Sequence, residues 1–192
     1  MTDLQPQVMH VPVGMLETSC WVISLPDSDS CVVVDPGADA QKIRQACGGK
    51  HIAAILLTHG HFDHIGAVDA LMEADTALYV HEMDAAMLAD AKLNVSWMIG
   101  ADIRVQAQPK SVREGDRIAA AGLSFDVLHT PGHTQGSCCY RAGTQLFTGD
   151  TMFRFGCGRT DLPGGDEGQM MQSLKRLQPM RRNHTIYPGH GV

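Results

Sequence analysis

Histidine and aspartate are concentrated in one short segment of the chain. Between Thr58 and His64 the sequence reads T-H-G-H-F-D-H, which places four potential metal ligands within six residues. Neutral imidazole and carboxylate groups are usual protein ligands of zinc. The apolar run Ile52 to Leu57 precedes this segment and predicts a buried strand that ends just before the ligands. The pattern therefore indicates a metal site anchored by rigid structure; the alternative is a solvated, histidine-rich loop.

Three later loops each place one potential ligand directly after a glycine. They read Thr130-Pro-Gly-His133, Phe147-Thr-Gly-Asp150 and Tyr187-Pro-Gly-His190. Glycine lets the backbone pass close to a site, and loops at strand ends are where a scaffold presents functional residues. Each loop alone is equally typical of an ordinary turn. Together with the first segment, the three loops predict one composite site.

Short strands and helices in alternation must position these loops. A helix is expected after Asp39 as N-cap, ending near Gly48, and another is expected over 65–72. A Met-rich helical stretch follows at 83–88, and 92–101 is ambiguous. Asp166 and Gln169 resemble a capping box that opens a helix ending near Leu177. Strands are expected at 8–13, 20–25, 31–34, 52–57, 77–80, 117–121, 123–128, 137–140, 145–147 and 185–187.

Length and composition favour one domain over 1–192, and the charge balance favours a small-molecule partner. The net charge of −6, with no basic cluster beyond Arg181-Arg182, argues against a nucleic-acid or membrane surface. Residues 1–6 lack a signal-peptide pattern, and the six cysteines contain no C-x-x-C pair, so reduced thiols and a cytoplasmic location are expected. The sequence indicates no oligomeric state.

Four motifs in order resemble those of the metallo-β-lactamase superfamily of hydrolases: T-H-G-H-F-D-H, T-P-G-H-T, F-T-G-D-T and Y-P-G-H-G. The resemblance implies an α/β (α+β) fold, a four-layer αβ/βα sandwich in which two mixed β-sheets are flanked by helices. It also implies two divalent metal ions at one edge. Zinc is expected, with iron or manganese as alternatives, because every ligand is nitrogen or oxygen. One ion would be held by His59, His61 and His133, the other by Asp63, His64 and His190, with Asp150 bridging.

The segment 149–166 and the turn Asp35-Pro-Gly37 are similar to those of glyoxalase II-like hydroxyacylglutathione hydrolases of the short, single-domain kind. This resemblance implies hydrolysis of a small anionic thioester such as S-lactoylglutathione by a single metallo-β-lactamase-like domain, with no separate C-terminal substrate domain of the kind that larger members of the family carry. Arg159 matches a basic position that holds glutathione in that family, whereas Asp161 replaces an aromatic residue. Arg159 and Arg154 are therefore candidate substrate-binding residues, with surface solvation or a structural ion pair as the alternative for both.

Hydrolysis is chemically consistent with this ligand set. Two divalent metals lower the pKa of a shared water from about 15.7 towards about 7, so a metal-bound hydroxide would attack the thioester carbonyl. No serine or cysteine nucleophile is then needed. Asp63, as ligand and proton acceptor, and Asp150, as bridge, are the candidate catalytic residues. The metal charge would make the pocket locally cationic, which favours an anionic substrate.

Three other functions remain open from the sequence. A mononuclear Fe(II) persulfide dioxygenase acting on glutathione persulfide would share the scaffold and a similar G-C-G-R-T-D segment. A binding module that merely retains the fold is a second alternative. Hydrolysis of a lactone, a β-lactam or a phosphodiester by the same hydroxide is the third.

Overall fold

The computed structural model describes residues 5–192, in which eleven strands form two mixed sheets. The first sheet has the order β1-β2-β3-β4-β5-β6 and is parallel from β3 to β6. Its strands are Gln7–Val13 (β1), Thr18–Ser24 (β2), Ser30–Val34 (β3), His51–Leu56 (β4), Ala77–His81 (β5) and Lys110–Val112 (β6).

The second sheet has the order β11-β10-β9-β8-β7 and is antiparallel except for the pair β10 and β11. Its strands are Arg117–Ala120 (β7), Leu123–His129 (β8), Cys138–Ala142 (β9), Gln145–Gly149 (β10) and Thr185–Pro188 (β11).

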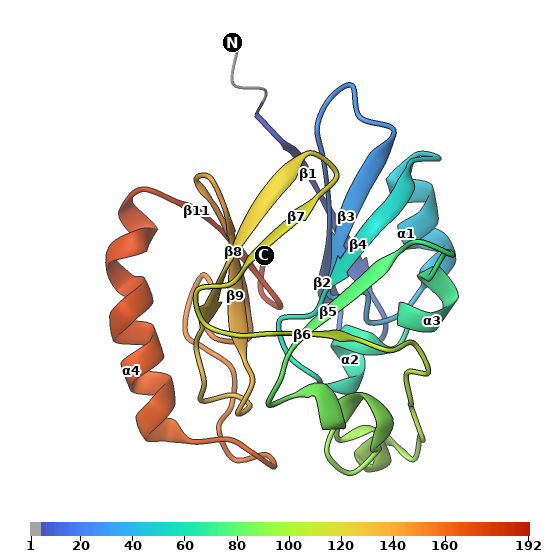
Figure 1. Cartoon of the computed structure of the whole chain (residues 1–192). Helices are drawn as coiled ribbons and strands as arrows, with labels where there is room; N and C mark the ends of the chain where they lie inside the picture. The colour runs from blue at the N-terminus through green and yellow to red at the C-terminus, as the bar shows by residue number, and fades with distance from the viewer. Residues whose placement is uncertain (1–4) are drawn as a thin grey trace.

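Helices lie outside both sheets, as Figure 1 shows: α1 and α3 beside the first sheet and α4 beside the second. The predicted four-layer αβ/βα sandwich is therefore confirmed. The α-helices are Ala40–Cys47 (α1), Phe62–Ile65 (α2), Val68–Leu71 (α3) and Glu167–Leu177 (α4), and the 3-10 helices are Ala85–Ala89 (η1), Ser96–Ile99 (η2) and Gln178–Arg182 (η3).

Strand alternation explains why the first sheet is covered on both faces. Successive side chains of a strand point to opposite faces, and in β3 Val33 packs with Ile43 of α1 whereas Val32 and Val34 pack towards the second sheet. The core between the sheets includes Phe125 of β8. A third apolar cluster lies between the second sheet and α4 and contains Cys139, Leu146, Met152 and Leu177.

Hydrogen bonds join the two sheets at the end where the ligand loops emerge. The Tyr140 hydroxyl donates to the Leu57 carbonyl at 2.8 Å, and Cys138 N donates to the Thr58 carbonyl at 2.8 Å. Between β2 and β11, Trp21 Nε1 donates to the Pro188 carbonyl at 3.0 Å. The bonds to the Leu57 and Thr58 carbonyls fix the strand end that precedes His59 relative to the second sheet.

The helix predicted over 65–72 is wrong as a single element, because the chain turns between α2 and α3. Gly66 N closes α2 on the Phe62 carbonyl, and the next amide, Ala67 N, donates to the Pro36 carbonyl at 2.9 Å instead of continuing the helix. The Met-rich helical stretch predicted at 83–88 is the 3-10 helix η1, and β6 was not predicted.

The two predicted helix starts have different outcomes. Asp39 stands at the N-cap of α1, but its side chain makes no capping bond and accepts from Gly14 N at 2.9 Å instead. Asp166 caps α4 as predicted, because its Oδ1 accepts from Gln169 N at 2.8 Å.

Among residues 5–192 no helix is long and apolar enough to cross a membrane. The prediction about a signal peptide concerns residues 1–6, and of these 1–4 lie outside the described residues.

Replacing Tyr140 by phenylalanine should destabilise the fold by about 1–3 kcal/mol, because it leaves the buried Leu57 carbonyl without its hydroxyl partner. Urea unfolding measures the change. The matched control is Tyr79→Phe, since no hydroxyl hydrogen bond of Tyr79 is found in the described part of the chain and its ring packs partly buried beside the core. Equal stability of Tyr140→Phe and the parent would contradict the role assigned to this bond.

Candidate metal centre

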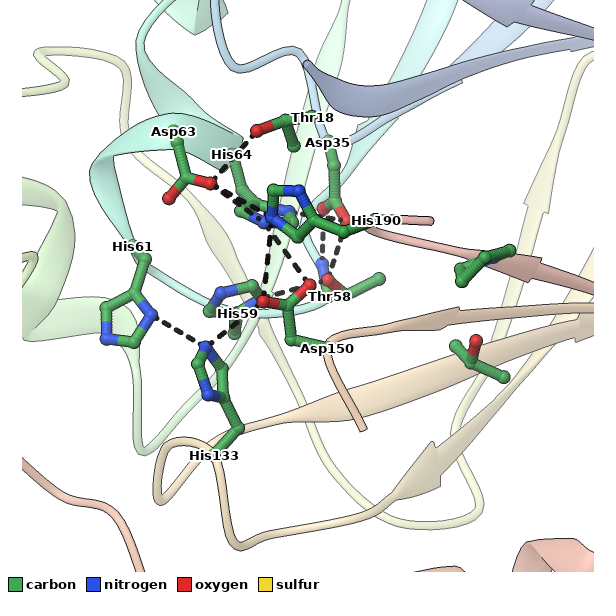
Figure 2. Close-up of polar contacts among 12 residues, drawn as sticks. Thr18, Asp35, Thr58, His59, His61, Asp63, His64, His133, Asp150 and His190 are labelled. Atoms are coloured by element: carbon green, nitrogen blue, oxygen red, sulfur yellow. Dashed lines mark hydrogen bonds and ion pairs between the residues drawn. The ribbon is translucent and has the colours of Figure 1, made fainter. Parts of the chain in front are cut away.

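The predicted ligands come from four loops that end strands of both sheets. His59 and His61 follow β4, and Asp63 and His64 lie on α2 directly after them. The other three lie after strands of the second sheet: His133 after β8, Asp150 after β10 and His190 after β11. Figure 2 shows the seven side chains converging on one volume.

Within that volume three groups of ligand atoms lie within 4.8 Å of one another. Two of them are the predicted triads: the first contains His59, His61 and His133, and the second contains Asp63, His64 and His190. The third group contains His59, His64 and Asp150 and so joins the two triads. Asp63 Oδ2 lies 3.2 Å from His190 Nε2 and 3.4 Å from His64 Nε2.

Asp150 lies between the two triads. Its Oδ2 is 3.5 Å from His133 Nε2 in the first and 3.7 Å from His190 Nε2 in the second. Its Oδ1 is 3.5 Å from His64 Nε2. One carboxylate therefore faces ligand atoms of both triads.

Protein atoms hold the Nδ1 side of three histidine rings. His59 Nδ1 lies 3.1 Å from Thr58 Oγ1, His133 Nδ1 lies 2.7 Å from the Arg159 carbonyl oxygen, and His64 Nδ1 lies 3.0 Å from Asp35 Oδ2. A partner on one ring nitrogen fixes the ring and leaves the other nitrogen to face a metal.

The buried atoms that face the centre include several without hydrogen-bond partners. In the described part of the chain these are His59 Nε2, His64 Nε2 and Asp150 Oδ1. His61 faces the centre with Nδ1, which lies 2.9 Å from His133 Nε2 (Figure 2). A buried polar atom without a partner costs about 1–3 kcal/mol. Such a cluster of nitrogen and oxygen donors fits a divalent metal such as zinc or iron.

Electrostatics leaves the His59 and His61 rings of the first triad neutral near pH 7. Burial, reinforced by the neighbouring His133, lowers the pKa of His61 to about 3, and burial lowers that of His59 well below its usual value. In the second triad, burial would raise the pKa of the Asp63 carboxyl, but the nearby His64 and His190 rings hold that pKa well below its usual range. Burial would lower the pKa of His64, but the Asp63, Asp150 and Asp35 carboxylates raise it. Because an imidazole must be neutral to bind a metal, a metal ion that binds His64 would displace its proton.

Comparison with known proteins identifies the family of this chain. Residues 13–190 match the family model described as the metallo-beta-lactamase superfamily. The chain belongs to the metallo-beta-lactamase superfamily. A probable metallo-hydrolase, YqgX of Bacillus subtilis (strain 168), is 38% identical over 190 residues, which cover 95% of this chain and 89% of the relative. A hydroxyacylglutathione hydrolase of Pseudomonas entomophila (strain L48) is 35% identical over 178 residues, which cover 88% of this chain but 60% of that relative.

Solved structures of the superfamily are similar over nearly the whole chain. The crystal structure of the B3 metallo-beta-lactamase BLEG-1 has a TM-score of 0.89 at 33% identity and covers 97% of this chain and 92% of that one. TTHA1623 in a di-iron-bound form has a TM-score of 0.85 at 36% identity, with coverage of 96% and 93%. ETHE1 from Myxococcus xanthus has a TM-score of 0.75 at 27% identity, with coverage of 97% and 76%.

The two candidate substrate-binding arginines of this superfamily member have local partners. Arg159 pairs with Asp161 through two contacts, Nε to Oδ1 at 2.6 Å and Nη2 to Oδ2 at 2.7 Å, and both side chains are exposed. The Arg154 guanidinium lies 5.6 Å from the Phe155 ring centre. A substrate contact of either arginine stays a prediction. All six cysteines are free thiols, as expected, and Cys157 is exposed.

Asp35 is a functional residue that the sequence showed only as part of a turn. Its Oδ1 accepts from Thr58 N at 2.8 Å and its Oδ2 from Thr58 Oγ1 at 2.6 Å, while Oδ2 also faces His64 Nδ1. The residue is buried and has a φ of 52°. One pattern in the sequence could have indicated this role. Asp35 directly follows the buried strand β3, and β3 lies beside β4, which leads into the ligand segment.

Asp84 is a second buried carboxylate that holds ligand loops, and no sequence motif marks it. Its Oδ2 accepts from Gly60 N at 3.1 Å and from Thr134 Oγ1 at 2.6 Å, and its Oδ1 accepts from Gly136 N at 2.6 Å. Gly60 separates His59 from His61, and Thr134 follows His133. Asp84 therefore connects the two loops that carry the first triad. Burial raises the pKa of this carboxyl, and these hydrogen bonds oppose the rise.

Asp84→Asn should weaken metal binding at the first triad by about 10–100-fold. In either amide orientation the new NH2 group faces a backbone N–H, of Gly60 or of Gly136, so one ligand loop loses its acceptor. Titration of the apo-protein with metal against a competing chelator measures the affinity.

The control for this variant is Asp69→Asn. Asp69 also accepts two backbone bonds, from Gln106 N at 2.8 Å and Ala107 N at 3.0 Å, but it touches no ligand loop. Metal affinity should stay at the parent value in the control. Parent-like affinity in Asp84→Asn as well would show that Asp84 does not position the triad.

Proposed function

We propose that this chain is a dinuclear metal-dependent hydrolase that cleaves a thioester such as S-lactoylglutathione. The observation that carries the proposal is the pair of triads with Asp150 facing both, together with the buried ligand atoms that lack protein partners. In this proposal one metal is held by His59, His61 and His133 and the other by Asp63, His64 and His190. Zinc is the proposed metal, with iron and manganese as alternatives.

Bound divalent metals would supply Lewis acidity and a low-pKa water to this site. The chain's own residues then set geometry and proton transfer. Thr18 Oγ1 donates to Asp63 Oδ2 at 2.9 Å and fixes that carboxylate (Figure 2). The Asp63 side chain is 14% exposed, so an attacking water could reach it and deliver its proton there.

A thioester is a suitable substrate for a site in which Asp63 is the proposed proton acceptor. An alkyl thiolate has a pKa near 8.5, so it leaves without obligatory protonation and no dedicated acid is needed. The similarity to a hydroxyacylglutathione hydrolase supports this substrate class, although the chain spans 60% of that relative's length. Arg159 would contact the anionic part of the substrate by exchanging its Asp161 partner for a substrate carboxylate.

Persulfide oxidation is the second candidate, favoured by the likeness to ETHE1. A mononuclear iron site needs two histidines and one carboxylate with open positions. In this chain His190 lies 3.2 Å from Asp63 and completes a second triad, which supports two metals and hence hydrolysis.

The test is metal content measured on the purified protein together with a panel of thioesters that includes S-lactoylglutathione. We expect two metals per chain and thioester cleavage. Asp63→Asn should lower kcat by about 10²–10⁴-fold, because the amide keeps the shape of the carboxylate but accepts no proton. One iron per chain with oxygen consumption on glutathione persulfide, or a panel with no thioester cleaved, would overturn the proposal.

A further inference from the structure

An apolar pocket of about 230 Å³ lies against the candidate centre. Its walls come from the turn between β1 and β2, the loop after β3, the start of α2 and the segment around the end of η2. Asp63 and Thr18 line it on one side. The other walls are mainly aliphatic and include Val13, Met15, Leu16, Ala38, Ile99 and Ile103.

Three of these apolar side chains are largely open to solvent. Met15 is 87% exposed, Leu16 54% and Ile99 48%. Apolar side chains that cluster at a concave surface mark a binding site, because water contact with them is unfavourable. The turn and the η2 segment therefore present a surface that a ligand would cover.

The pocket is continuous with the ligand set. Thr18, in its wall, donates to Asp63 Oδ2, the same oxygen that lies 3.2 Å from His190 Nε2. Gly37, also in the wall, packs against the Asp63 backbone so closely that a Cβ there would lie 1.5 Å from the Asp63 carbonyl oxygen. A group bound in the pocket would thus lie beside the second triad.

The charges around the pocket select an uncharged occupant. Asp63 is the one ionisable residue that lines it, and no lysine or arginine does so among residues 5–192. A charged group placed against the aliphatic walls, away from the metal side of the pocket, would lose hydration without gaining a partner. Glutathione and similar thiol carriers are charged, whereas acyl groups are not, so the acyl side of a thioester fits this wall.

We propose that the pocket binds the acyl group of the substrate and that the enzyme prefers apolar acyl groups to the polar lactoyl group. The inference rests on the proposed function for the identity of the scissile bond. An apolar cavity of about 150 Å³ accepts benzene. A pocket of about 230 Å³ accordingly holds a phenyl ring or an alkyl chain of about six carbons.

Binding of product acids tests the pocket without turnover. Acetate, butyrate, hexanoate and phenylacetate are titrated into the metal-loaded chain by calorimetry. Affinity should rise about fourfold per added methylene up to hexanoate. In Leu16→Ser and Ile99→Ser, the rise in affinity with chain length should be smaller. In Met171→Ser, which removes a 61% exposed side chain on α4, the rise should equal that of the parent. If affinity in the parent protein does not rise with chain length, the proposal is overturned.

Turnover of glutathione thioesters with the same acyl groups separates the two proposals. A kcat/KM that rises with acyl size and falls in Ile99→Ser supports both. Cleavage of S-lactoylglutathione with no gain from larger acyl groups overturns the pocket and leaves the hydrolase. If affinity for the carboxylic acids rises with their chain length but no thioester is cleaved, the proposed function is overturned and the apolar pocket is supported. Circular dichroism melting confirms that the variants fold.

Discussion

Two buried carboxylates hold the loops on which the whole site depends. Asp35 accepts from the backbone and hydroxyl of Thr58 and faces His64, and Asp84 accepts from Gly60, Thr134 and Gly136. Burying a charge is tolerated only when it is fully hydrogen-bonded or paired. Both carboxylates meet this condition by taking the N–H groups of the ligand loops, so the loops cannot shift without leaving a buried charge unsatisfied.

Close backbone contacts explain the glycines before the ligands. A Cβ at Gly189 would lie 2.2 Å from Asp150 Oδ1, and one at Gly149, where φ is 48°, would lie 2.2 Å from Thr58 Oγ1. Loops from two sheets can therefore meet only where the side chain is absent. The resulting crowding brings seven ligand side chains into one volume and shields most of them from water.

Much of this arrangement could be predicted from the sequence, because it is encoded locally. Apolar runs such as Ile52 to Leu57 define buried strands, and Asp166 with Gln169 defines a helix start. The break between α2 and α3 depends on the distant Pro36 carbonyl, which accepts from Ala67 N, and the role of Asp84 depends on loops 24 and 52 residues away. Such long-range packing leaves no local pattern. The sandwich itself followed from resemblance rather than from periodicity.

The central claim is that both triads bind metal and share Asp150. A crystal structure of the metal-loaded chain, with anomalous scattering recorded at the metal absorption edges, measures this directly. The account predicts two anomalous peaks, one within ligand distance of His59, His61 and His133 and one within ligand distance of Asp63, His64 and His190, with Asp150 contacting both. A single peak, or a second triad that remains without metal at saturating concentration, would contradict it.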